Sequence, residues 1–185
     1  MKRTLIFTIA IVALLAAGFA IASDSLQGES NDKNSRQAQH EARQQQRAQR
    51  LAEYREHLDS TILSHNYRFV PQTMQQLPAG MMRNLQNPCY EIIVWSEAVD
   101  VCIPFLKGYT PPYYPVVFNY VLSSVQGYTV EQTDYGWHVT FQSTMFTATT
   151  FTFSFEIYSH YGGATLTISS PFYNSMQYTG NIFGI

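Results

Sequence analysis

Residues 151–169 read FTFSFEIYSHYGGATLTIS. Apolar and polar side chains alternate in this stretch on both sides of a glycine pair, Gly162–Gly163. Strict alternation is typical of a β-strand with one buried face. Glycine tolerates the positive φ angles that a tight connection between strands requires. The stretch therefore predicts an antiparallel hairpin whose loop covers residues 159–163. Its inward positions are Phe151, Phe153, Phe155 and Ile157 on the first strand and Ala164, Leu166 and Ile168 on the second.

Similar short strand patterns occur on both sides of this hairpin. They cover residues 67–70, 90–95, 101–105, 116–121, 128–132, 137–141 and 176–182. Two further hairpins are expected, one through the turn at residues 133–136 and one joining 90–95 to 101–105. About eight short strands with turn signals every ~8 to 12 residues indicate an antiparallel sandwich or a partly closed barrel. Because no helices alternate with the strands, we predict a mainly β (α+β) domain over residues 66–185.

A polar segment precedes the strands. Neither proline nor glycine interrupts residues 35–65, which predicts one N-terminal helix. Its first half is rich in Arg and Gln, whereas Leu51, Tyr54, Leu58 and Ile62 recur at helical spacing in its second half. We expect the amphipathic second half to pack against the β domain and the polar first half to be solvated. The first half is either a spacer or a partner-binding surface, and the sequence leaves both interpretations open.

The chain begins with the pattern of an export signal. Lys2 and Arg3 precede an apolar run, and Ala20-Ile21-Ala22 follows it. This order predicts a signal peptide over residues 1–22, cleaved after Ala22, although the run is also long enough for an uncleaved anchor. A flexible linker is expected at residues 23–34, with no transmembrane segment after cleavage. No cysteine follows the run, so we predict a periplasmic or secreted protein that is not a lipoprotein.

The charge balance argues against a nucleic-acid partner. The chain has 11 Lys and Arg against 13 Asp and Glu, and loss of Lys2 and Arg3 with the signal leaves a net charge of −4. Binding to nucleic acid depends on a positive surface that displaces counterions. The aromatic content of 15% instead indicates a chain that can form a packed core.

Motifs for metal binding and catalysis are missing from the sequence. The five histidines form no HExxH pair, and the two cysteines form no CxxC, so we predict no metal site and no cofactor. No G-x-S-x-G motif occurs. Glu131 and Glu156 could be neighbours across a sheet, but acids on outward strand faces usually serve solubility. A non-catalytic protein is favoured. A hydrolase with an unrecognised carboxylate or His site and a small outer-membrane β-barrel remain as alternatives.

Cys89 and Cys102 raise the question of a disulfide, because disulfides persist outside the cytosol. With a turn centred near residues 97–98, Cys102 would face Ile92 or Ile93 across the hairpin. Cys89 would then lie about 10 Å from Cys102, beyond the ~7 Å Cα separation that a bridge allows. The favoured interpretation is therefore two small buried thiols, and a disulfide is kept as the alternative.

The most suggestive local feature is a stiff loop, KGYTPPYYP, at residues 107–115. Its three prolines exclude it from a central strand, and its three tyrosines offer flat faces with hydroxyl groups. Tyr109, Tyr113 and Tyr114 are the predicted binding residues. Capping of the β core is nevertheless the favoured interpretation of these rings, with ligand binding as the alternative. A second aromatic group lies near the last turns. That second group consists of Tyr158, Tyr161, Phe172 and Tyr173.

Several short stretches together resemble an exported family of Bacteroidetes, the domain-of-unknown-function family 4251. They are SHNYRFV at 64–70, NPCY at 87–90, Pro104-Phe105, Tyr128 with Gly136-Trp137, ATLTISS at 164–170 and YTGNI at 178–182. The resemblance covers roughly residues 51–182. It implies a compact, mostly β domain in the cell envelope, and it implies no activity and no catalytic residues.

These observations together predict an uncharacterised exported domain of the cell envelope that acts as a binding module. Its expected ligand is a glycan, a peptide or another envelope component, bound on a tyrosine-rich surface. A monomer is expected.

Overall fold

The computed structural model describes residues 35–96, 98–107, 114–123, 125–145 and 149–185, without the side chains of Tyr114 and Met145. These residues form a helix at 35–63 and ten strands. The strands are β1 (Tyr67–Gln76), β2 (Arg83–Asn84), β3 (Glu91–Val94), β4 (Val99–Lys107), β5 (Tyr114–Leu122), β6 (Gln126–Thr133), β7 (Gly136–Met145), β8 (Thr149–Tyr158), β9 (Gly163–Ser170) and β10 (Tyr173–Gly184).

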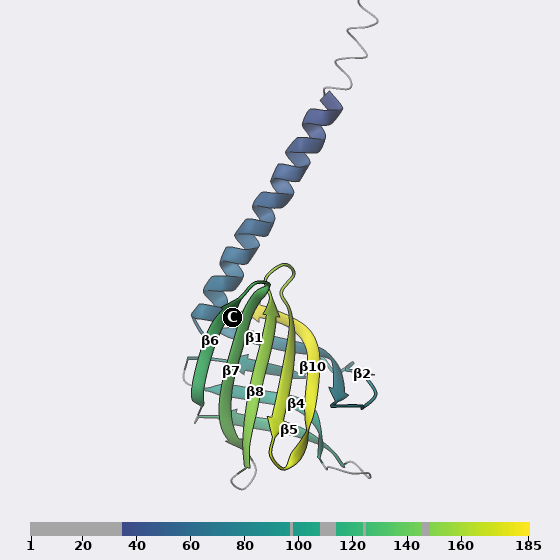
Figure 1. Ribbon diagram of the computed structural model, residues 1–185, viewed down its shortest axis with the longest axis vertical. Coiled ribbons are helices and arrows are strands. Elements are labelled where there is room, and N and C mark those ends of the chain that lie inside the picture. The colour runs from purple at the N-terminus through teal and green to yellow at the C-terminus, as the bar shows by residue number, and fades with distance from the viewer. Residues whose placement is uncertain (1–34, 97, 108–113, 124, 146–148) are drawn as a thin grey trace, which may run out of the picture. The chain divides into compact units, whose positions relative to one another are not determined.

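The strands form one antiparallel sheet in the order β5-β4-β3-β1-β10-β9-β8-β7-β6, with the short β2 paired to β1. β1 joins two runs of consecutive hairpins, since it pairs with β3 on one side and with β10 on the other. The sheet curls into a half-barrel. In Figure 1, strands β6 to β10 (green to yellow) form one layer, and the teal strands cross behind it.

Aromatic rings fill the space inside the curl. Phe151, Phe153 and Phe155 on β8 are fully buried, as their alternation with polar residues predicts. The ring centroids of Phe151 and Phe118 on β5 lie 5.5 Å apart across the core. The Tyr178 hydroxyl on β10 donates a hydrogen bond of 2.7 Å to the Pro104 carbonyl on β4. The two halves of the sheet are thus joined by ring packing and by a buried hydrogen bond.

The opposite face of β6 to β10 is polar. Paired positions on neighbouring strands place Thr140, Ser154 and Thr167 in one row across β7, β8 and β9. These positions alternate with the buried ones, so one face of this part of the sheet is apolar and the other carries mostly hydroxyl groups.

The chain divides into two units, residues 1–50 and 51–185. In the first unit, the described residues 35–50 are helical and exposed. In the second, helix residues Leu58 and Ile62 are buried, whereas Leu51 and Tyr54 stay partly exposed. The helix ends where His65 takes a φ of 54°. Within the described part of the chain, no helix combines the length and hydrophobicity of a membrane span.

The sequence-based fold prediction is confirmed, since the chain is mainly β with one N-terminal helix. Ten strands are found where about eight were expected, and the two-residue β2 is the strand that no sequence pattern marks. The hairpin of residues 151–169 forms as expected, and Gly162 takes a φ of 63° in its loop. The signal peptide and linker at residues 1–34 lie outside the described residues.

Candidate functional site

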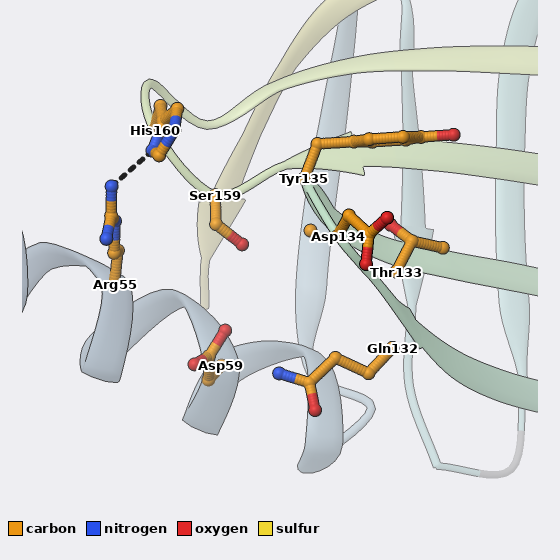
Figure 2. A pocket seen from close by; sticks show the side chains of 9 residues that line it. Arg55, Asp59, Gln132, Thr133, Asp134, Tyr135, Ser159 and His160 are labelled. Carbon is orange, nitrogen blue, oxygen red and sulfur yellow. Dashed lines mark hydrogen bonds between the residues drawn. The ribbon is translucent and has the colours of Figure 1, made fainter.

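Two connections lie at the same end of the sheet, the β6–β7 turn and the β8–β9 loop. The carbonyl of Tyr135 in the turn accepts a hydrogen bond of 3.0 Å from the Ser159 amide in the loop. A cavity of about 180 Å³ lies between these connections and the helix. Figure 2 shows Arg55 and Asp59 of the helix facing Ser159 and His160 of the loop. The remaining lining residues are Gln132, Thr133, Asp134, Tyr135 and Gly136.

Gly136 allows the turn to approach β8 closely. A Cβ atom at this position would lie 1.9 Å from the carbonyl oxygen of Ile157, and the φ of Gly136 is 157°. No side chain fits at that distance from a backbone atom. The glycine therefore determines where the preceding residue, Tyr135, is held.

Two polar contacts join the helix to the sheet beside this cavity. Arg55 donates a hydrogen bond to Nδ1 of His160, as the dashed line in Figure 2 shows. Because arginine is a donor only, Nδ1 of His160 is the acceptor in this contact. Trp137 donates its indole N–H to Asp59 Oδ1 over 2.6 Å. These contacts set the position of the helix side chains that line the cavity.

Trp137→Phe should lower the free energy of unfolding by about 1 to 2 kcal/mol, because it removes a hydrogen bond to a carboxylate while keeping an aromatic ring. Chemical denaturation measures the change. Asp59→Ala is the partner variant, since alanine has no side-chain acceptor, and the two losses should be far from additive, because both variants remove the same contact. Additive losses would show that the indole and the carboxylate act independently.

Three tyrosines follow one another beside the cavity, and we call Tyr135, Tyr158 and Tyr161 the tyrosine row. The ring centroids of Tyr135 and Tyr158 are 6.1 Å apart, and those of Tyr158 and Tyr161 are 5.6 Å apart with the planes at 15°. Tyr135 and Tyr161 are the outer members and are 56% and 66% exposed. The row therefore presents aromatic surface to solvent while its rings support each other.

A second hollow of about 240 Å³ lies on the other side of Tyr135. Glu131 on β6, His138 on β7 and Glu156 on β8 stand at paired positions, so the histidine lies between the two acids. The expectation that the acids could be direct neighbours is therefore wrong, because β7 separates their strands. His138 Nε2 lies 2.8 Å from Ser154 Oγ. This hollow adds two carboxylates to the polar groups around the tyrosine row.

Thr133 lies between the two hollows and lines both of them. Its hydroxyl oxygen is buried and has no hydrogen-bond partner among the described residues. Buried polar atoms are usually paired with protein or with water. The Thr133 hydroxyl is therefore an unpaired polar group enclosed at this end of the sheet.

The predicted binding loop cannot be compared with this site. Tyr109 and Tyr113 lie outside the described residues, and Tyr114 opens β5 with a side chain that the structure does not describe. The second predicted aromatic group separates into two parts. Tyr158 and Tyr161 belong to the tyrosine row, whereas Tyr173 stacks on Phe151 with centroids 6.0 Å apart and Phe172 lies beside it in the β9–β10 turn.

Three of the histidines, His65, His138 and His160, contact different partners. The His65 ring lies 4.3 Å from that of Tyr128, His138 contacts Ser154, and His160 contacts Arg55. Among the described residues, no group of three His, Cys, Asp or Glu side chains could hold a metal ion.

The cysteines carry free thiols, Cys89 exposed and Cys102 half-buried. Cys102 pairs with Glu91, so the expected pairing with Ile92 or Ile93 is wrong by one or two residues. The turn is centred earlier, because Trp95 donates its amide hydrogen to the Ala98 carbonyl. Burial raises the pKa of the Cys102 thiol, and Asp100 and the Cys89 thiol raise it further. Cys102 is therefore a poor nucleophile at neutral pH.

Sequence reasoning missed Arg55, Asp59 and Tyr135 as site residues. Arg55 and His160 are 105 residues apart, and no short motif links them. One signal was available for Tyr135. In consecutive antiparallel hairpins, the turn before β7 and the loop after β8 must lie at the same end of the sheet, which places Tyr135 near Tyr158 and Tyr161.

The helix, the curled sheet and this polar, tyrosine-lined end define a class of small α+β domains. A crystal structure of a DUF4251 family protein from Bacteroides eggerthii DSM 20697 has a similar fold, with a TM-score of 0.53 and 13% sequence identity. The match covers 71% of this chain and 87% of that chain. Residues 49–182 match the family described as domain of unknown function (DUF4251). The chain belongs to this family, as the resemblance indicated, and no curated protein matches it.

Proposed function

We propose that this protein is an exported binding module of the cell envelope and that it binds a glycan at the tyrosine row. The exposed row beside two polar hollows is the observation that supports this proposal. Sugar rings combine apolar C–H faces with many hydroxyl groups. A site for them needs flat aromatic surface together with hydrogen-bonding groups at its margin.

The two hollows supply both kinds of hydrogen-bonding group. Arg55 and Gln132 donate hydrogen bonds, whereas Asp134, Glu131 and the other carboxylates accept them. A polyhydroxylated ligand can pair with such a mixed set, while a strongly acidic ligand would face the carboxylates of both hollows. The arrangement therefore favours a neutral or amine-bearing saccharide over an anionic one.

Binding fits the site better than catalysis. Arg55 and His160 contact each other, and Asp59 accepts the indole N–H of Trp137. Part of their hydrogen-bonding capacity therefore holds the site together, and the remaining donors and acceptors are left for a ligand. Export is supported by the signal pattern at residues 1–22.

Tyr161→Ala should weaken glycan binding by about 10- to 30-fold, because an exposed aromatic ring that contacts a ligand commonly contributes about 1.4 to 2 kcal/mol. A screen of the exported chain against a glycan array identifies an oligosaccharide, and titration calorimetry measures its affinity. Tyr135→Ala should have a similar effect, since Tyr135 is the other outer member of the row.

Phe172→Ala is the matched control, because Phe172 is an equally exposed ring in the β9–β10 turn. Tyr113→Ala tests the loop at residues 107–115 in the same assay. If Tyr113→Ala abolishes binding and Tyr161→Ala leaves it intact, the loop is the binding surface and the tyrosine row is not. Absence of any glycan ligand in the array would contradict the proposal as a whole.

A further inference from the structure

Strand β5 is an edge of the sheet, and its one proline, Pro115, stands near its start, four residues before Asn119. The strand pairs with β4 and with no other described strand. All nine of its residues pair with β4 without a register shift, so no bulge bends it away. Its sequence, YPVVFNYVL, contains no charged residue. A long, regular, uncharged edge of this kind is a template for pairing with another strand.

The other edge of the sheet is protected. The pairing of β6 with β7 shifts between Gln126 and Thr129, and β6 carries Glu131. Bulges and charges are two devices that prevent pairing at an edge. Pairing of β5 with β6 of another copy, which could continue into an open filament, is thus disfavoured. A contact of β5 with itself forms a closed dimer.

The same types of residue occur on both sides of Asn119 in β5. An aromatic residue stands next to it on each side, Phe118 and Tyr120, and a valine stands two residues away on each side, Val117 and Val121. An antiparallel pair of β5 strands related by a two-fold axis at Asn119 would place Val117 opposite the Val121 of the second copy. It would also place Phe118 opposite Tyr120. Aromatic and β-branched pairs directly opposite each other are the pairs that stabilise a sheet.

The exposure of these residues agrees with such a contact. Val121 is 68% exposed and Val117 is 51% exposed, although both are β-branched apolar residues in a regular strand. Asp100, which pairs with Val121, is the acid nearest this edge on β4. The two-fold axis would place the two copies of Asp100 at opposite ends of the shared edge, so they would not repel each other.

We propose that the protein forms a two-fold symmetric dimer through antiparallel pairing of β5 with β5 of a second copy, with Asn119 facing Asn119. This proposal departs from the monomer expected from the sequence. The proposed dimer contact does not involve the glycan site, which lies at the β6–β7 turn and the β8–β9 loop.

Asn119→Lys should convert the dimer into a monomer, because the substitution places two ammonium groups opposite each other only in this register. Sedimentation equilibrium of the exported chain should show a mass that doubles with rising concentration, and Asn119→Lys should raise the dissociation constant by about tenfold or more. Thr167→Lys is the matched control, since it adds the same charge to the polar face of the central strand β9 and should leave the dimer intact.

A mixture of Asn119→Lys and Asn119→Asp chains gives the sharpest test. Opposite charges at the two-fold axis should restore a dimer of one chain of each kind. A wild-type chain that stays monomeric at millimolar concentration would overturn the proposal and leave the edge to an extended peptide of another protein. A dimer that persists in Asn119→Lys would also overturn it, because it would require another surface.

Discussion

Phe153→Ala is expected to lower the free energy of unfolding by about 3 to 5 kcal/mol, the range for removing a buried phenylalanine ring. Phe153 is fully buried on β8, and its ring stacks on that of Phe141 with centroids 4.9 Å apart. The neighbouring strands are hydrogen-bonded on both sides of β8, so the sheet cannot collapse easily into the cavity. Urea denaturation followed by tryptophan fluorescence measures the loss.

Phe172→Ala is the control for this prediction too, because the Phe172 ring is 64% exposed in the β9–β10 turn. Its effect should stay within about 0.5 kcal/mol. A Phe153→Ala loss below ~1 kcal/mol would mean that the core can repack around the missing ring. Burial of the β8 phenylalanine rings would then not be the main source of the stability of the fold.

The fold could be predicted where side-chain pattern and burial agree. Phe151, Phe153 and Phe155 alternate with polar residues because one face of β8 meets the core and the other meets water. Leu58 and Ile62 recur at helical spacing for the same reason. β2 could not be predicted, because two exposed residues carry no periodicity. The predicted register of β3 and β4 was wrong. A backbone hydrogen bond in the turn determines this register, and the side-chain sequence does not predict that bond.

The candidate site was less predictable than the fold. Its parts come from the helix and from two turns that meet only when the sheet has formed. Arg55 on the helix and His160 in the loop are ordinary exposed residues until the fold brings them together. The prediction of a single second aromatic group was also based on residue type alone. It placed Phe172 and Tyr173 together with Tyr158 and Tyr161. The topology places these pairs in different connections of the sheet.

Two buried tyrosines should make the protein sensitive to alkaline pH. Tyr67 and Tyr178 are both fully buried. Burial raises the pKa of each hydroxyl well above its usual value near 10, and the Tyr128 hydroxyl, 3.2 Å away, raises that of Tyr67 further. In the folded protein both hydroxyls therefore keep their protons at a pH where the unfolded chain has lost them. The stabilising contribution is complete below pH ~10.

Above pH ~10 the unfolded state binds fewer protons than the folded state, so the free energy of unfolding falls as pH rises. Each tyrosine contributes about 1.36 kcal/mol per pH unit, and together they should cost about 4 kcal/mol at pH 11.5. Denaturation curves between pH 9 and pH 11.5 measure this slope, and absorbance at 295 nm shows whether these tyrosines ionise only on unfolding. Tyr178→Phe should lower the slope even though it also removes the hydrogen bond to Pro104, whereas Tyr161→Phe, at an exposed position, should leave it unchanged. A slope that is equal in all three proteins would show that other groups govern unfolding at high pH.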